Sequence, residues 1–119
     1  MAELDLAYRV RSYSTGTLGR AISNARNHHW VADDSGGEEL GAGEFFLSGI
    51  SACAVNMIER IASEEETPLD WMDVSVEAYR NPDAEPGEVT LYEDVRVHFQ
   101  MWGVSDDDGQ RLVDIWKQR

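Results

Sequence analysis

The chain has 119 residues, enough for one domain with a modest core, so we expect residues 1–119 to form a single domain. Its 10 basic and 23 acidic side chains give a formal net charge of −13. Such a surface repels phosphate backbones and anionic lipids, which excludes a nucleic-acid partner and argues against a membrane partner. In addition, no apolar run approaches the roughly 20 residues of a membrane span. The sequence starts without the pattern of a signal peptide and holds one cysteine, so we expect a reducing, cytoplasmic location.

The N-terminal part of the sequence predicts a meander of β-strands. In residues 4–13 apolar side chains occupy alternate positions, which places on one face Leu4, Leu6, Tyr8 and Val10. The glycine-rich turn STGTLG follows, and the segment RAISNARNHHWVAD predicts one or two further strands. Residues 33–43, DDSGGEELGAG, then predict an acidic, glycine-rich loop.

A long apolar helix is predicted over residues 44–66. Its apolar stripe has spacings of four, three, four and four and contains Phe46, Ile50, Cys53, Met57 and Ile61. Further apolar side chains widen the stripe until the first half of the helix is apolar almost all round. The helix would be roughly 34 Å long, about as long as a domain of this size is wide. Because a small chain can hardly enclose such a helix, we expect a second copy to cover it in a homodimer.

The second half of the chain predicts two long strands and a closing helix. Apolar and polar residues alternate in WMDVSVEAY and in LYEDVRVHFQMW, which predicts a long hairpin with one solvated face. Ser105 is a predicted N-cap, and the three aspartates after it suit the positive end of a helix dipole. The apolar stripe of this helix is expected to contain Leu112, Ile115 and Trp116. The order of elements predicts an α+β fold with antiparallel sheets and a long central helix.

Cys53 admits two interpretations. A lone cysteine in an apolar helix is usually a small buried hydrophobe, whose thiol is inert because burial raises its pKa. A reactive thiol needs a cation beside the sulfur, and Cys53 lies about two and a half turns inside the helix, beyond the reach of the helix dipole. The cation must then come from the N-terminal strands, where the candidates are Arg11, Arg20, Arg26, His28 and His29.

Glu44 opens the predicted helix, where a carboxylate complements unpaired backbone N–H groups. It stands nine residues before Cys53, so the two side chains point to opposite sides of the helix, about 13 Å apart along its axis. The two could cooperate only across a dimer interface. No metal or cofactor is expected, because adjacent His28 and His29 face opposite sides of a strand and no metal-ligand spacing occurs.

The stretch HHWVADDSGGEELGAGEFFLSGISACAVNMIERIA joins a strand, a glycine-rich loop and a Glu-led apolar helix with a mid-helix cysteine. It resembles the OsmC/Ohr family of osmotically inducible and organic-hydroperoxide-resistance proteins, and the order of elements agrees over nearly the whole chain. The resemblance implies an intertwined homodimer with active sites at the subunit interface. It also implies a thiol-dependent peroxidase that reduces organic or hydrogen hydroperoxides in oxidative and osmotic stress defence.

The same resemblance implies roles for three residues. Cys53 matches the cysteine that attacks the O–O bond of a hydroperoxide, and Glu44 matches the glutamate that helps to hold an activating arginine. The family's arginine falls nearest to Thr17 or Leu18 of this chain, and Arg20, two or three positions later, is its substitute. In the family a second cysteine forms a disulfide with the oxidised one, and a dithiol reductant such as a lipoylated protein restores both.

These 119 residues contain no second cysteine. Two alternatives to the peroxidase therefore stay open. One is a non-catalytic dimer of the same fold that binds small hydrophobic molecules at its interface. The other is a structural or interaction protein in which Cys53 is inert.

Overall fold

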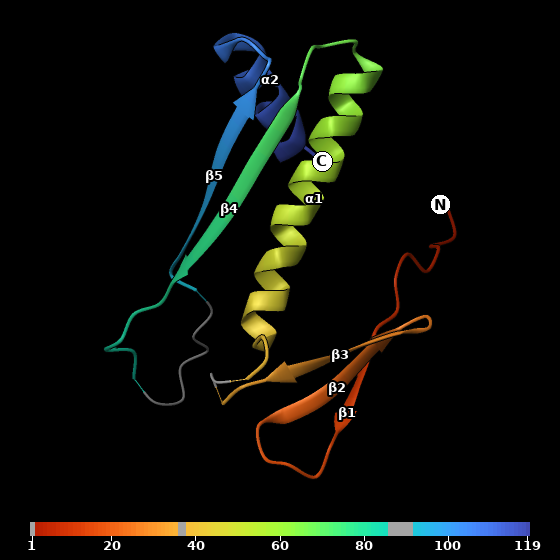
Figure 1. Cartoon of the computed structure of the whole chain (residues 1–119), viewed down its shortest axis with the longest axis vertical. Coiled ribbons are helices and arrows are strands. Elements are labelled where there is room, and N and C mark those ends of the chain that lie inside the picture. The colour runs from red at the N-terminus through yellow and green to blue at the C-terminus, as the bar shows by residue number, and fades with distance from the viewer. Residues whose placement is uncertain (1, 36–37, 86–91) are drawn as a thin grey trace. The chain divides into compact units, whose positions relative to one another are not determined.

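The structure is a computed structural model that describes residues 2–35, 38–85 and 92–119. Its internal contacts divide the chain into two compact units, Met1–Phe46 and Leu47–Arg119. The elements are, in chain order, β1 (Arg11–Ser14), β2 (Arg20–Ala25), β3 (His28–Asp33), α1 (Ala42–Glu64), β4 (Trp71–Tyr79), β5 (Asp94–Trp102) and α2 (Asp106–Lys117) (Figure 1). The predicted α+β fold with antiparallel sheets and one long helix is confirmed.

The N-terminal unit contains an antiparallel sheet in the order β1–β2–β3. The turn between β2 and β3 has two residues, and one of them, Arg26, has a φ of 56°, in the left-handed region that such turns require. The predicted strand over residues 4–13 is wrong in its first part, because residues 2–10 form no strand. The reason lies in the partner strand: Arg11 pairs with Asn24 and β2 ends at Ala25, so no β2 backbone lies opposite residues 2–9.

In the C-terminal unit β4 and β5 form an antiparallel pair whose register runs from Trp71 opposite Trp102 to Tyr79 opposite Asp94. The predicted strand over residues 71–79 is confirmed, whereas the second strand begins at Asp94 and leaves out Tyr92 and Glu93, which the pattern over residues 91–102 had included. In β4 the alternate residues from Met72 onward are the less exposed ones. Leu91, which the sequence pattern assigned to the apolar face, lies outside the described residues.

A hydrophobic core forms in this unit where α1, β4 and α2 meet (Figure 1). Its buried members are Ala54, Ile58, Ile61, Ala62, Met72, Leu112 and Val113. The rings of Phe99 and Trp116 close one edge, with their centroids 5.6 Å apart and a T-shaped arrangement. The predicted apolar stripe of α2 thus does pack inward.

The start of α2 is fixed by local chemistry. Ser105 is the N-cap, as predicted, and its hydroxyl accepts a hydrogen bond from the backbone N–H of Asp108 at 3.2 Å. Just before this cap, Gly103 has a φ of 80°, and a Cβ there would lie 2.4 Å from Cγ of Asp70. Only glycine satisfies both the backbone angle and the space at this position.

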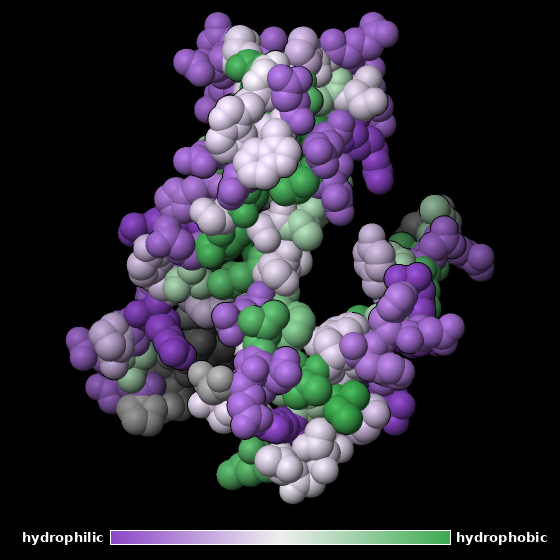
Figure 2. Space-filling model, viewed as in Figure 1, coloured by the Kyte–Doolittle hydropathy of each residue, from purple (hydrophilic) through white to green (hydrophobic). Residues whose placement is uncertain are grey.

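Helix α1 begins two residues earlier than predicted and differs strongly along its length. Its buried residues, Ala54, Ile58, Ile61 and Ala62, all lie in its second half, whereas the Phe46 side chain in the first half is 64% exposed. Hydrophobic side chains accordingly reach the surface along the course of α1 (Figure 2).

By length and composition alone, α1 is long and apolar enough to cross a membrane. In its apolar 18-residue stretch, 22% is buried. This corrects the expectation that no apolar run approaches such a length. Polar residues interrupt the apolar ones, so the sequence shows no uninterrupted apolar run, but the mean hydropathy over 18 residues of α1 reaches 1.3. The core helix of a soluble protein passes the same test, and the second half of α1 packs as such a helix.

Candidate active site

Cys53 lies midway along α1 and is exposed, whereas the next residue, Ala54, is completely buried. Successive helical side chains differ by about 100° in direction, so the helix turns Ala54 into the core and Cys53 away from it. The thiol is therefore no member of the hydrophobic core in the described part of the chain. The interpretation of Cys53 as a small hydrophobic residue buried within its own chain is therefore wrong.

Glu44 helps to cap the start of α1. Since the helix begins at Ala42, Gly41 is the N-cap and Glu44 is the third helical residue. Oε1 of Glu44 accepts a hydrogen bond from the backbone N–H of Gly41 at 2.9 Å, which is the glutamate half of a capping box. The predicted role of this carboxylate at the helix start is confirmed.

Arg20 is the first residue of β2 and stands directly opposite Asp33, the last residue of β3. Its Nη2 lies 3.4 Å from Oδ2 of Asp33 and also contacts Oε2 of Glu38. The hydrogen bond and charge of Glu38, followed by the charge of Asp33, raise the pKa of Arg20. Among the residues that the structure describes, Arg20 forms no ion pair with Glu44.

Asp33 is a residue that the sequence analysis did not select. It is 1% exposed, and its Oδ1 accepts a hydrogen bond from the backbone N–H of Ser35 at 2.8 Å. Hydrogen bonding from Ser35 lowers the pKa of Asp33, with a further contribution from the charge of Arg20, against the opposing effect of burial. Only the cross-strand register, which brings Arg20 opposite, could have indicated this residue in advance.

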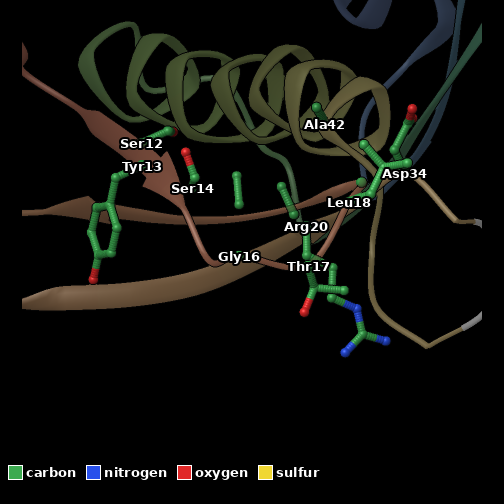
Figure 3. A pocket seen from close by; sticks show the side chains of 12 residues that line it. Ser12, Tyr13, Ser14, Gly16, Thr17, Leu18, Arg20, Asp34 and Ala42 are labelled. Atoms are coloured by element: carbon green, nitrogen blue, oxygen red, sulfur yellow. The ribbon is translucent and has the colours of Figure 1, made fainter.

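A pocket of about 730 Å³ lies beside the first hairpin of the N-terminal unit (Figure 3). Its lining includes Tyr13, Thr17, Leu18, Arg20 and Asp34. The Leu18 side chain is fully exposed at the tip of the turn, and the backbone N–H of Arg20 donates to the carbonyl of Thr17 at 3.2 Å. Thr17, Leu18 and Arg20, the three positions that the sequence analysis considered for the activating arginine, therefore line one pocket.

Two of the three histidines are on β3 and one is on β5. His28 and His29 are at the exposed start of β3. His98, on β5, has its Nε2 2.5 Å from Oε1 of Glu77 on β4. In the described ranges, no group of three potential metal ligands comes together.

No family model matches the sequence, and no curated protein matches it either. The structure is, however, similar to an OsmC-like protein from Mycoplasma pneumoniae, with a TM-score of 0.85 at 14% identity over 98% of this chain and 84% of that one.

The chain has an OsmC-like fold. A hypothetical protein from Aquifex aeolicus VF5 gives a TM-score of 0.76 at 13% identity, over 94% of this chain and 80% of that one. An organic hydroperoxide resistance protein OsmC from Legionella pneumophila gives 0.75 at 15% identity, over 98% of this chain and 85% of that one. At these identities the likeness establishes the OsmC-like fold, which the sequence resemblance predicted, and the chemistry has to be argued from the chain's own residues.

Proposed function

We propose that this chain is a thiol-dependent peroxidase of the OsmC/Ohr kind, which reduces organic hydroperoxides or hydrogen peroxide through Cys53. The observation that carries the proposal is the position of this cysteine, exposed and midway along the long helix of an OsmC-like fold. An exposed thiol is open to a small oxidant, whereas a thiol sealed in a core is not. Its role would be defence against oxidative and osmotic stress in a reducing cytoplasm.

In the proposed reaction, the Cys53 thiolate attacks one oxygen of the peroxide O–O bond. A sulfur–oxygen bond forms and the O–O bond breaks. The leaving group takes up a proton: an alkoxide from an organic hydroperoxide becomes an alcohol, and hydroxide from hydrogen peroxide becomes water. The peroxide is reduced by two electrons, and Cys53 is oxidised to a sulfenic acid. A dithiol reductant, for example a lipoylated protein, then returns two electrons: it becomes a disulfide, the thiol is restored and water is released. Among these 119 residues no second cysteine is available, so in the proposed reaction the reductant attacks the sulfenic acid directly.

Arg20 is the proposed cation for the thiolate. A positive charge beside a thiol lowers its pKa and raises the fraction of the reactive form. Glu44 is the proposed carboxylate that holds this arginine in the assembled site. Its Oε1 binds the N–H of Gly41, so the contact with the arginine would be made through Oε2.

The proposed assembly is a homodimer in which a second copy covers the apolar first half of α1. The exposed Phe46 ring supports this proposal, because a large aromatic side chain left in water is unfavourable and gains free energy when another subunit buries it. Sedimentation velocity tests it: the parent chain would sediment as a dimer, and Phe46→Glu would weaken the dimer at least about tenfold, since one unpaired interfacial charge costs at least about 1.4 kcal/mol. A parent chain that stays monomeric at high micromolar concentration contradicts the dimer.

The peroxidase is tested by the consumption of cumene hydroperoxide with dihydrolipoamide as reductant. We expect turnover by the parent chain and a loss of at least about 100-fold in Cys53→Ser, because the serine hydroxyl is not a comparable nucleophile at neutral pH. Ser51→Ala, on the same helix, is the matched control and would retain turnover. Equal consumption by the parent and Cys53→Ser would exclude the peroxidase.

A second function, binding of small hydrophobic molecules without catalysis, is favoured by the pocket beside the first hairpin, to which Tyr13 and Leu18 contribute apolar surface. A fluorescent apolar probe such as anilinonaphthalene sulfonate distinguishes the two functions. Binding that Leu18→Ser weakens, in a chain that consumes no hydroperoxide, would identify a binding protein.

A further inference from the structure

The first residue pair of the β2–β3 register places opposite charges on neighbouring strands. Arg20 and Asp33 are cross-strand partners, so their Cβ atoms are about 4.5–5.5 Å apart. The guanidinium needs no long reach across the sheet, and its Nη2 ends 3.4 Å from Oδ2 of Asp33. The contact thus follows from the β2–β3 register and forms whenever these two strands pair.

The carboxylate of Asp33 is itself fixed. Its side chain is fully buried, and Oδ1 is tied to the backbone N–H of Ser35. The backbone of Asp33 is also anchored, because its N–H donates to the carbonyl of Leu40 at 2.9 Å. The next N–H along the chain, of Asp34, donates to the carbonyl of Gly19 at 2.8 Å, adjacent to Arg20. Asp33 therefore has no freedom to follow a moving arginine.

The second carboxylate oxygen of Asp33 favours the ion pair with Arg20. Oδ2 is buried and has no hydrogen-bond partner among the described residues. A buried carboxylate oxygen without a partner is unfavourable unless a positive charge is close. Since hydrogen bonding from Ser35 lowers the pKa of Asp33, this carboxylate stays ionised at neutral pH and retains its need for a cation.

The other acidic partner of Arg20 has the opposite character. The Glu38 side chain is 71% exposed and is carried by the loop after β3. Ion pairs between exposed side chains contribute little and exchange readily with water. The guanidinium donates its hydrogen bond to Glu38, but of the two carboxylates at the same nitrogen that of Asp33 is the one held in a fixed place.

We propose that Asp33 is the positioning residue of Arg20, holding its guanidinium at the edge of the pocket that both the first turn and β2 line. This inference rests on the proposed function, in which Arg20 activates the Cys53 thiol. It assigns to a buried β3 residue the task of orienting the arginine, in addition to the proposed task of Glu44.

Alkylation of Cys53 by iodoacetamide between pH 6 and 9 tests the proposal in the intact chain. Asp33→Asn keeps an oxygen for the N–H of Ser35 but removes the charge that orients Arg20. If Asp33 positions Arg20, the variant is alkylated at least about threefold more slowly at pH 7, and its profile moves to higher pH. If Asp33 acted only as a nearby negative charge, its removal would favour the thiolate and speed the reaction. A faster or unchanged rate would therefore overturn the proposal.

Glu39→Gln is the matched control, because it removes one negative charge from an exposed side chain in the loop after β3 that does not line the pocket. This variant is expected to show no slowing. Slowing of equal size in Glu39→Gln would show that the effect does not depend on the contact with Arg20, and would also overturn the proposal.

Arg20→Ala separates this inference from the proposed function. If Arg20→Ala leaves alkylation unchanged, Arg20 is not the activating cation and that part of the proposed function fails. The positioning is then decided in the parent chain by ¹⁵N relaxation of the arginine side chains. Arg20 Nε is expected to be ordered, with an order parameter close to that of the backbone, in contrast to Arg60 on the exposed side of α1. An Arg20 Nε as mobile as that of Arg60, or one whose order survives in Asp33→Asn, would contradict the role of Asp33.

Discussion

The two units of this chain are stabilised in different ways. In the C-terminal unit every buried residue of the described core is apolar, and Ile58 and Leu112 have no exposed surface at all. In the described part of the N-terminal unit the buried residues are Ser23 and Asp33, both polar. The C-terminal unit therefore has its own hydrophobic core, whereas the N-terminal unit relies on strand pairing and on the contact between Asp33 and Arg20.

This difference indicates which unit would gain more from the proposed dimer. A sheet of short strands without an apolar core is marginal by itself, since a few strands need a covered hydrophobic face for independent stability. The N-terminal unit also exposes most of the surface of Leu4, Leu6, Tyr8 and Val10. Covering by another subunit would benefit this unit more than the C-terminal one.

The largest expected effect is that of Leu112→Ala, which leaves a cavity in the closed core. We expect a loss of about 2–5 kcal/mol in the free energy of unfolding, measured by urea denaturation. Leu4→Ala is the matched control, because its side chain is 97% exposed and its removal should change stability by less than about 0.5 kcal/mol. Similar losses in both variants would contradict the contrast between the units.

Two glycines of the C-terminal unit should respond in opposite directions. Gly103→Ala forces a side chain into the left-handed region and against Asp70, and should cost about 1–3 kcal/mol. Gly49→Ala fills open space on α1 and should stabilise the isolated chain by about 0.5–1 kcal/mol. Thermal unfolding of both variants checks the signs. A destabilising Gly49→Ala would show that another molecule occupies the space beside the exposed half of α1.

Ser105→Ala should have a smaller effect, since it removes one hydrogen bond at the start of α2. The expected cost is about 1 kcal/mol. Amide hydrogen exchange would show faster exchange in the first turn of α2, and Ser105→Thr should restore most of the protection. Because this helix is packed by its own core, the β1–β3 amides should not respond; faster exchange there would show that the two units unfold as one.

The smallest expected effect concerns the pH dependence of the N-terminal unit. The pKa of Asp33 is lowered by hydrogen bonding from Ser35 and by Arg20, so the folded unit favours the ionised form. The stabilisation is present above the ordinary aspartate pKa of about 3.9 and is lost as pH falls through the lowered value. The protection of the β2 and β3 amides relative to their intrinsic exchange rates should therefore fall below about pH 4 in the parent chain. This protection should depend less on pH in Asp33→Asn. Identical profiles would argue against a stabilising Asp33 carboxylate.

What could be predicted from the sequence was set by short-range patterns. The strand over Trp71–Tyr79 follows from strict alternation, and the cap at Ser105 from side-chain chemistry within one turn. Residues 4–10 also alternate, though more loosely, but form no strand, because a strand also needs a partner and β2 ends where these residues would pair.

The candidate site shows the same limit. The sequence pattern identified Cys53 and the helix-start role of Glu44, which depend on position within one helix. It could not decide which side of a helix that is apolar almost all round would face the core, so the exposure of Cys53 had to come from packing. It also missed Asp33, whose importance depends on a register between two strands.

The exposed sulfur has a practical consequence for testing whether the proposed dimer forms. With a single cysteine among 119 residues, a nitroxide reagent attaches at one defined point, midway along α1. Pulsed electron paramagnetic resonance would then record a dipolar coupling only when two labelled molecules come together, and its frequency would give the separation of the two labels directly.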